Sequence, residues 1–232
     1  MRSLLAIFTL LIATTTYAAD IDQSGAEDLG WKLGIQAWTN NKATLHETLE
    51  LAQRLQLHFV EAYPGQVLRA DSEEKMGPGM SDESLDGLLE KAEECDIQIA
   101  AFGVTGIPGD EEGARKFFEW CEKIGIETVS TEIGEEEIKT IGPIAEELGI
   151  GIAIHNHPQP SHYWGPDTVL AAVKGAPGCV GACADTGHWV RSGLNPVESL
   201  KKLEGRVISL HFKDLSALEG DQHDVIWGTG VG

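Results

Sequence analysis

The sequence is short of cysteine and of basic residues, and each shortage excludes a class of protein. Four cysteines in 232 residues lack the dense spacing of a disulfide framework. One close pair, Cys179 and Cys183, is too little for a thiolate-rich structural zinc site. Lysine and arginine total 17 against 37 acidic residues, for a formal net charge of -20. A surface this acidic repels phosphodiester backbones, so we expect no nucleic-acid partner.

The apolar run at the N-terminus is too short to span a bilayer. Residues 4–12 follow the positively charged Arg2 and precede the small-x-small sequence Thr16-Tyr17-Ala18. This pattern is typical of a secretory signal peptide, which is removed on export. We therefore predict a signal peptide over residues 1–19, a single domain over residues 20–232, no membrane span after cleavage, and a periplasmic or secreted protein.

The rest of the chain alternates short apolar runs with amphipathic segments. Such alternation predicts parallel strands joined by right-handed crossovers. The periodicity predicts strands over residues 31–38, 59–61, 97–104, 128–132, 151–155, 180–185 and 207–211. It predicts helices over residues 44–55, 81–95, 110–124, 135–148, 166–174 and 196–203.

Glycine is missing where an open, dinucleotide-binding sheet would need it. Residues 37–41, which follow the first expected strand, contain no glycine, whereas a phosphate-binding loop at that point is glycine-rich. The predicted α/β fold is therefore a TIM (β/α)8-type barrel. Because an eighth unit would only begin at residues 227–232, we predict a barrel that lacks the eighth strand-helix unit.

Acidic and imidazole side chains follow the predicted strands. In a barrel the carboxyl ends of the strands form one face, so these side chains should converge. Asp185 and His211 end consecutive strands, and an acid beside an imidazole indicates a metal site. With imidazole and carboxylate ligands and no thiolate, the predicted cofactor is one divalent metal ion, Mn, Mg, Co or Zn. The other polar residues at or beyond strand ends are Glu61, Glu132, His155, Asn156, His157, His188, Asp214, Asp221 and His223.

The individual roles of these side chains follow less directly from the sequence. Glu132 ends a buried strand, where an unpaired carboxylate is costly, and this favours a functional role. His188 is expected to contact substrate or to shuttle protons. For His155 and His157, on one side of an extended segment, a metal clamp and a hydrogen-bonded wall are equally open. Glu61 is either a substrate-binding acid or a loop carboxylate.

Three motifs together resemble those of a known family. Cys183-Ala184-Asp185-Thr186-Gly187-His188, Leu210-His211-Phe212-Lys213-Asp214 and Gly228-Thr229-Gly230 look like motifs of the sugar phosphate isomerase/epimerase family of xylose isomerase-like barrels. The resemblance extends over nearly the whole chain after the signal peptide. It implies one divalent ion held by two Glu, one Asp and one His, and Asp185 and His211 match the last two.

The chain departs from that family at its fifth strand. His155-Asn156-His157 stands where the family has its first Glu. This arrangement is similar to the inosose dehydratase-like branch, and Glu132 on the preceding strand could supply the missing carboxylate. The second family Glu belongs to the eighth strand, which is the unit expected to be missing.

The resemblance implies a metal-dependent isomerase or epimerase that acts on a keto sugar or sugar derivative through an ene-diolate intermediate. The implied partner is a small-molecule carbohydrate, and formation of a homo-oligomer is left open. Without the eighth unit, the chain itself is expected to be poorly active. The implied catalytic residues are Glu132, His157 and His188, the substrate-binding residues Glu61, His155 and Trp189, and the metal ligands Glu132, Asp185 and His211.

Three other functions remain open. A sugar dehydratase or lyase of the inosose dehydratase type would use the His-rich fifth strand as its acid. A metal hydrolase resembling endonuclease IV is suggested by Asp185, His188, His211, Asp221 and His223, although an acidic, exported chain is poorly suited to DNA. A non-catalytic sugar-binding module would follow if the eighth unit is naturally absent.

Overall fold

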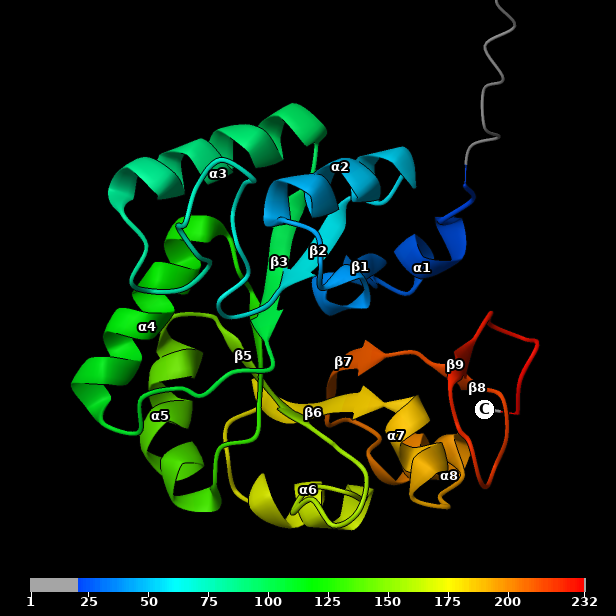
Figure 1. The fold of residues 1–232 in the computed structure, drawn as a ribbon. Coiled ribbons are helices and arrows are strands. Elements are labelled where there is room, and N and C mark those ends of the chain that lie inside the picture. Colours follow the sequence, from blue (N-terminus) through cyan, green and yellow to red (C-terminus); the bar gives the residue numbers. More distant parts are fainter. Residues whose placement is uncertain (1–20, 232) are drawn as a thin grey trace, which may run out of the picture.

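A curved sheet of parallel strands organises the molecule. The computed structural model describes residues 21–231, so the predicted signal peptide over residues 1–19 lies outside the described residues. The seven strands of this sheet pair in chain order, from β1 to β7 (Figure 1). They are β1 (Gly34–Gln36), β2 (Phe59–Ala62), β3 (Gln98–Gly103), β4 (Thr128–Thr131), β5 (Gly151–His155), β6 (Val180–Asp185) and β7 (Val207–His211).

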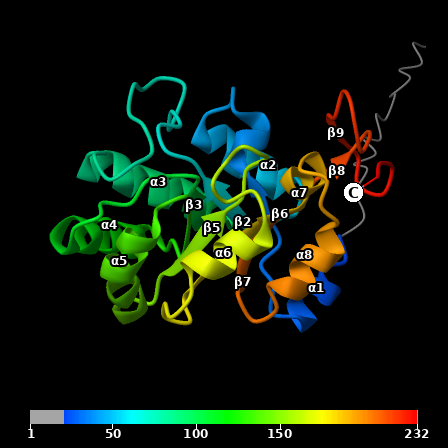
Figure 2. The ribbon, with the colours of Figure 1, turned by 90° about the horizontal axis from the view of Figure 1, so that it is seen from below.

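The main helices surround this sheet on its outer side (Figures 1 and 2). Side-chain caps fix where several of them begin: Thr44 and Glu47 form a capping box at α2, and Asp110 caps α4. Besides the 3-10 helix η1 (Ala37–Asn40), the helices are α1 (Ser24–Asp28), α2 (Leu45–Arg54), α3 (Asp82–Cys95), α4 (Glu111–Ile124), α5 (Glu135–Glu147), α6 (Pro166–Ala172), α7 (Thr186–Arg191) and α8 (Pro196–Lys202).

The apolar stripes of the helices pack into a hydrophobic core with buried residues of the strands. Leu45 and Leu49 of α2 and Phe118 of α4 are 0% exposed, as is Phe102 of β3. Burying a side chain of this size contributes about 1.5–3 kcal/mol each to folding. The short apolar runs and the apolar stripes of the amphipathic segments in the sequence therefore correspond to the surfaces that pack together in the core.

The predicted fold class is confirmed. Strands in continuous order are typical of a TIM barrel, whereas the strand order of an open doubly wound sheet reverses at a switch point. Within residues 21–231, β1 and β7 do not pair, and the antiparallel strands β8 (Asp214–Leu215) and β9 (Asp224–Val225) follow β7 in place of an eighth parallel strand. No helix in this part of the chain has the length and hydrophobicity of a membrane span.

Gly181 on β6 allows β6 and the chain entering β7 to approach closely. A Cβ at this position would lie 2.1 Å from the backbone oxygen of Arg206. That oxygen accepts a hydrogen bond of 2.7 Å from the backbone N–H of Ala182, so it cannot move away without weakening the bond. We expect Gly181→Ala to lower the free energy of unfolding by about 1–3 kcal/mol, which urea unfolding measures.

Gly87→Ala is the matched control for this substitution. Gly87 lies inside α3, and nothing lies within 4 Å of a Cβ added there. Alanine is the better helix former, so Gly87→Ala should raise the free energy of unfolding by about 0.5–1 kcal/mol. A Gly181→Ala protein as stable as its parent would contradict the packing described for β6.

Candidate functional site

The carboxyl ends of five strands carry polar side chains that meet on one face of the sheet. Asp185 and His211 are direct partners in the register of β6 and β7. The predicted convergence at the strand ends is thus present in the structure. We call this group the strand-end cluster, and its members are Glu61, Glu132, His155, His157, Cys183, Asp185, His188, His211 and Lys213.

Asp185 is held in position by hydrogen bonds to neighbouring elements. It is 0% exposed and caps α7, where its Oδ1 accepts a hydrogen bond of 2.9 Å from His188 N. Asn156 Nδ2 donates to Asp185 O at 3.0 Å, and Asp185 N donates to Asn156 Oδ1 at 2.8 Å. These bonds leave Oδ2 as the carboxylate oxygen that faces the other strand ends.

Nitrogen atoms from other members of the cluster surround Asp185 Oδ2. Lys213 Nζ lies 2.5 Å from this oxygen, His155 Nε2 3.5 Å, His188 Nε2 3.6 Å and His211 Nδ1 3.9 Å. Ligands of one tetrahedral ion with bonds of about 2.1 Å lie about 3.4 Å apart. The spacing between the carboxylate and the imidazoles is therefore close to what a single metal ion requires.

Two further carboxylates contact these imidazoles on their other ring nitrogens. Glu61 Oε2 lies 2.6 Å from His211 Nε2. Glu132 Oε1 is in hydrogen-bond contact with His157 Nδ1 and lies 3.9 Å from His155 Nδ1. A carboxylate on the far nitrogen of a metal-binding histidine fixes the orientation of the ring. Glu61 thus favours an orientation in which His211 presents its remaining nitrogen, Nδ1, to the buried acid.

Asp185 and Glu132 are ionised at neutral pH. Burial raises the pKa of Asp185, but contacts with His155, His188 and Lys213 outweigh burial and hold that pKa well below its usual range. Contacts with His155 and His157 lower the pKa of Glu132 to about 2. Both carboxylates are therefore in the ionised form in which acidic side chains bind metal ions.

The environment of the cluster lowers the pKa of one imidazole and raises the pKa of two others. Burial lowers the pKa of His188 to about 3, so its ring is neutral, the form that binds metals. Burial also lowers the pKa of His155, but contacts with its neighbouring carboxylates outweigh it and raise the pKa to about 9. For His211, Cys183 and Glu61 likewise outweigh burial and raise the pKa to about 11. Protons on His155 and His211 therefore supply positive charge that a bound metal ion would replace.

Three overlapping sets of donor atoms could hold a metal ion. His155 belongs to all of them, and in each set the atoms lie within 4.8 Å of one another. His155 is 3% exposed, and its Nδ1 has no hydrogen-bond partner among the described residues. Buried polar atoms without partners are rare, and here the surrounding donors fit a divalent ion. The sets are His155, Asp185 and His188; His155, Cys183 and His211; and Glu132, His155 and His157.

Some residues predicted from the sequence occupy other environments. Trp189 is 1% exposed, so its ring packs in the core, and its position does not support a substrate contact. Glu132 and His157 are 33% and 44% exposed and form the accessible rim of the cluster. Asp221 and His223, which the nuclease pattern requires, lie on the exposed turn between β8 and β9, 3.9 Å from each other.

The sequence-based site omitted two members of the cluster, Cys183 and Lys213. The sequence spacing of both residues from predicted members of the site could have identified them. Cys183 precedes Asp185 by two residues on β6, and Lys213 follows His211 by two residues at the end of β7. Side chains two residues apart in an extended segment point to the same side, so both belong with the acid and the imidazole that were predicted.

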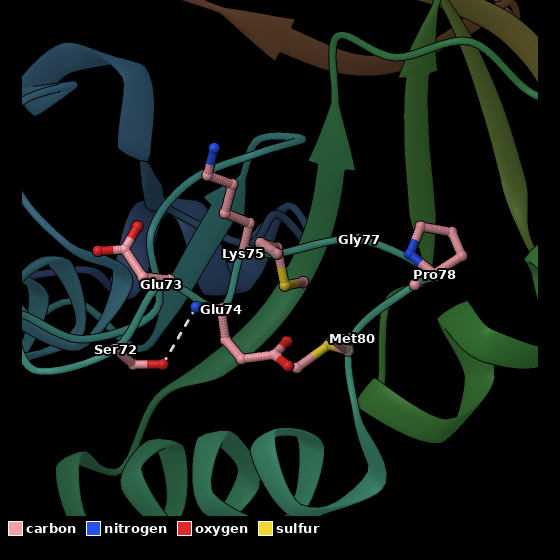
Figure 3. A pocket seen from close by; sticks show the side chains of 9 residues that line it. Ser72, Glu73, Glu74, Lys75, Gly77, Pro78 and Met80 are labelled. Atoms are coloured by element: carbon pink, nitrogen blue, oxygen red, sulfur yellow. Dashed lines mark hydrogen bonds between the residues drawn. The ribbon is translucent and has the colours of Figure 1, made fainter.

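The loop between β2 and α3 forms a separate hollow (Figure 3). Its lining is the continuous segment 72–80, in which Glu74 N donates a hydrogen bond of 3.1 Å to Ser72 Oγ. No member of the strand-end cluster lines this hollow. This hollow is therefore separate from the candidate site at the strand ends.

Solved structures of other proteins are similar to this chain in sequence and fold. The chain is 35% identical to an uncharacterized protein from Parabacteroides distasonis ATCC 8503, with a TM-score of 0.68, and the match covers 87% of this chain and 81% of that chain. No protein-family model matches the sequence, and no curated protein matches it.

Two more distant structures share the fold. A xylose isomerase-like TIM barrel protein from Mycobacterium smegmatis, solved in complex with magnesium, is 14% identical with a TM-score of 0.62, covering 82% of this chain and 76% of that chain. D-Psicose 3-epimerase from Clostridium cellulolyticum H10, solved with D-tagatose, is 15% identical with a TM-score of 0.59, covering 78% and 72%. The chain therefore belongs to the family of the Parabacteroides distasonis protein and has the fold of the xylose isomerase-like TIM barrels.

Proposed function

We propose that the protein is a metal-dependent isomerase or epimerase of a keto sugar or sugar derivative. The observation that carries this proposal is the arrangement around Asp185 Oδ2, where imidazole nitrogens lie at 3.5, 3.6 and 3.9 Å at the carboxyl ends of parallel strands. In barrels of this type the carboxyl ends of the strands hold the active site. The magnesium complex and the sugar epimerase with the same fold support the choice of cofactor and substrate class.

Asp185 and His211 are the proposed metal ligands, with the buried imidazole of His155 beside them. A divalent ion at this position would supply Lewis-acid polarisation of a carbonyl oxygen. His211 is oriented by Glu61 at 2.6 Å, and Asp185 is oriented by Asn156 and by its place at the start of α7. This preorganisation lowers the cost of assembling the ligands around the ion.

Glu132 and His157 are the proposed proton-transfer groups at the rim of the site. Glu132 is ionised, because its contacts lower its pKa to about 2, and it is partly exposed to solvent. An ionised carboxylate at the accessible rim can accept a proton from the carbon between a carbonyl and a hydroxyl group, and the contacts with His155 and His157 that lower its pKa also weaken it as a base. One base that takes and returns the proton gives isomerisation, whereas epimerisation requires a second group on the opposite side.

A dehydratase or lyase is the second candidate. The observation that favours it is the direct contact between His157 and Glu132, which holds the imidazole at the rim. An acid in this place would protonate a leaving β-hydroxyl after the base has removed the neighbouring proton. The same residues thus support both reactions, and the products distinguish them.

Incubation of the metal-loaded protein with keto sugars in deuterated water tests the proposal. An isomerase or epimerase should incorporate solvent deuterium into recovered sugar, and a dehydratase should give a product that has lost water. Mass spectrometry reads both outcomes. The chelated protein is the control and should give neither. Absence of exchange and of dehydration with every keto sugar tried would overturn the proposed function.

A further inference from the structure

Cys183 belongs to the strand-end cluster and precedes Asp185 by two residues on β6. It is 0% exposed and occupies the same side of β6 as Asp185, two residues away. In the sheet it is the register partner of His155 on β5. Its sulfur and one ring nitrogen each of His155 and His211 lie within 4.8 Å of one another. The thiol is thus enclosed by two imidazoles that belong to the proposed metal site.

The environment of Cys183 differs from that of the other cysteines. Among the described residues, the sulfur of Cys183 lies in a group of three candidate metal-ligand atoms, with His155 and His211. Cys95, Cys121 and Cys179 belong to no such group in this part of the chain. The complete burial of Cys183 excludes attack on a substrate in solvent, which leaves a role inside the cluster.

The imidazoles next to Cys183 have the features of metal ligands. The His155 ring is 3% exposed, and its Nε2 lies 3.5 Å from Asp185 Oδ2. His211 Nε2 is already paired with Glu61 at 2.6 Å, so Nδ1 is the nitrogen left to bind an ion. A histidine with a carboxylate on its far nitrogen is a common arrangement at metal centres.

We propose that Cys183 is a ligand of the divalent ion, together with His155 and His211, and that the site therefore selects zinc or cobalt over magnesium. The inference rests on the metal site proposed above and adds a donor that the carboxylate and imidazole set did not contain. Thiolate ligands favour zinc and similar soft ions, whereas magnesium prefers oxygen ligands. Zinc bound by sulfur and nitrogen is tetrahedral, which leaves a position for Asp185 or substrate.

Titration of the chelated full chain with Co²⁺ tests this assignment. A thiolate bound to Co²⁺ gives an intense near-ultraviolet charge-transfer band, whereas oxygen and nitrogen ligands give only weak visible bands. We expect the charge-transfer band in the parent and its loss in Cys183→Ser and Cys183→Ala. We also expect Cys183→Ser to weaken Zn²⁺ binding by at least about 100-fold and to leave Mg²⁺ binding unchanged.

Cys121→Ser is the matched control, because Cys121 is also 0% exposed but lies in α4, away from the cluster. It should keep the charge-transfer band, and circular dichroism should show that each variant is folded. Visible Co²⁺ bands without a charge-transfer band in the parent would overturn the role of Cys183 and leave the proposed sugar enzyme intact. A parent that binds no divalent ion would overturn both proposals.

Discussion

Asp185→Asn is expected to reduce the divalent metal content of the purified protein to near background. The substitution removes the charge from the carboxylate oxygen around which Lys213 Nζ and the imidazole nitrogens lie. Asparagine still caps a helix, so α7 should keep its hydrogen bond to the backbone N–H of His188. Elemental analysis gives the metal content, and circular dichroism reports whether the fold is retained.

The same change at Asp110 provides a control. Asp110 caps α4 by accepting a hydrogen bond of 2.9 Å from Gly113 N, and it does not belong to the strand-end cluster. Asp110→Asn should therefore leave the metal content unchanged. His211→Ala, measured beside Asp185→Asn, should also lose metal. If both of these site variants keep the metal content of the parent, the proposed ligands are wrong.

The strands and most helices could be predicted because their signals are local. An apolar run of four to six residues, or a stripe repeated along a helix, lies within one window of sequence. Helix α7 lacks such a signal, because Thr186–Arg191 is only 6 residues long and begins at the functional Asp185. No helix is predicted over these residues. The ring of Trp189, which the resemblance implies as a substrate contact, is 1% exposed and lies in the core.

The contacts within the cluster could not be predicted because they join distant parts of the chain. Glu61 and His211 are 150 residues apart in sequence and their side chains lie 2.6 Å apart. The sequence places each residue at a strand end, but only the curvature of the sheet brings β2 opposite β7. The pairing of Glu132 with His157 has the same origin, since it depends on the alignment of β4 with β5. Which carboxylate orients which imidazole is therefore a property of the tertiary structure.

Glu132→Gln should lower the rate of turnover of a keto sugar by about 100-fold or more, the scale expected for losing a general base. The change removes one negative charge and keeps the shape of the side chain, so the fold should be little altered. His157→Asn should lower the rate by about 100-fold as well and leave the metal content nearly intact, because it removes the imidazole in contact with Glu132. Steady-state kinetics and elemental analysis of each variant provide the two readouts.

The metal content separates the two predicted roles of Glu132. A low rate with the metal content of the parent assigns Glu132 as the base, whereas a fall in both assigns it as a ligand. Glu127→Gln is the matched control. Glu127 lies just before β4, at the opposite end of the strand from Glu132, and pairs with Lys32. Glu127→Gln should change neither the rate nor the metal content. If Glu132→Gln turns over substrate as fast as Glu127→Gln does, proton transfer takes place elsewhere in the cluster, and the rim formed by Glu132 and His157 has no catalytic part.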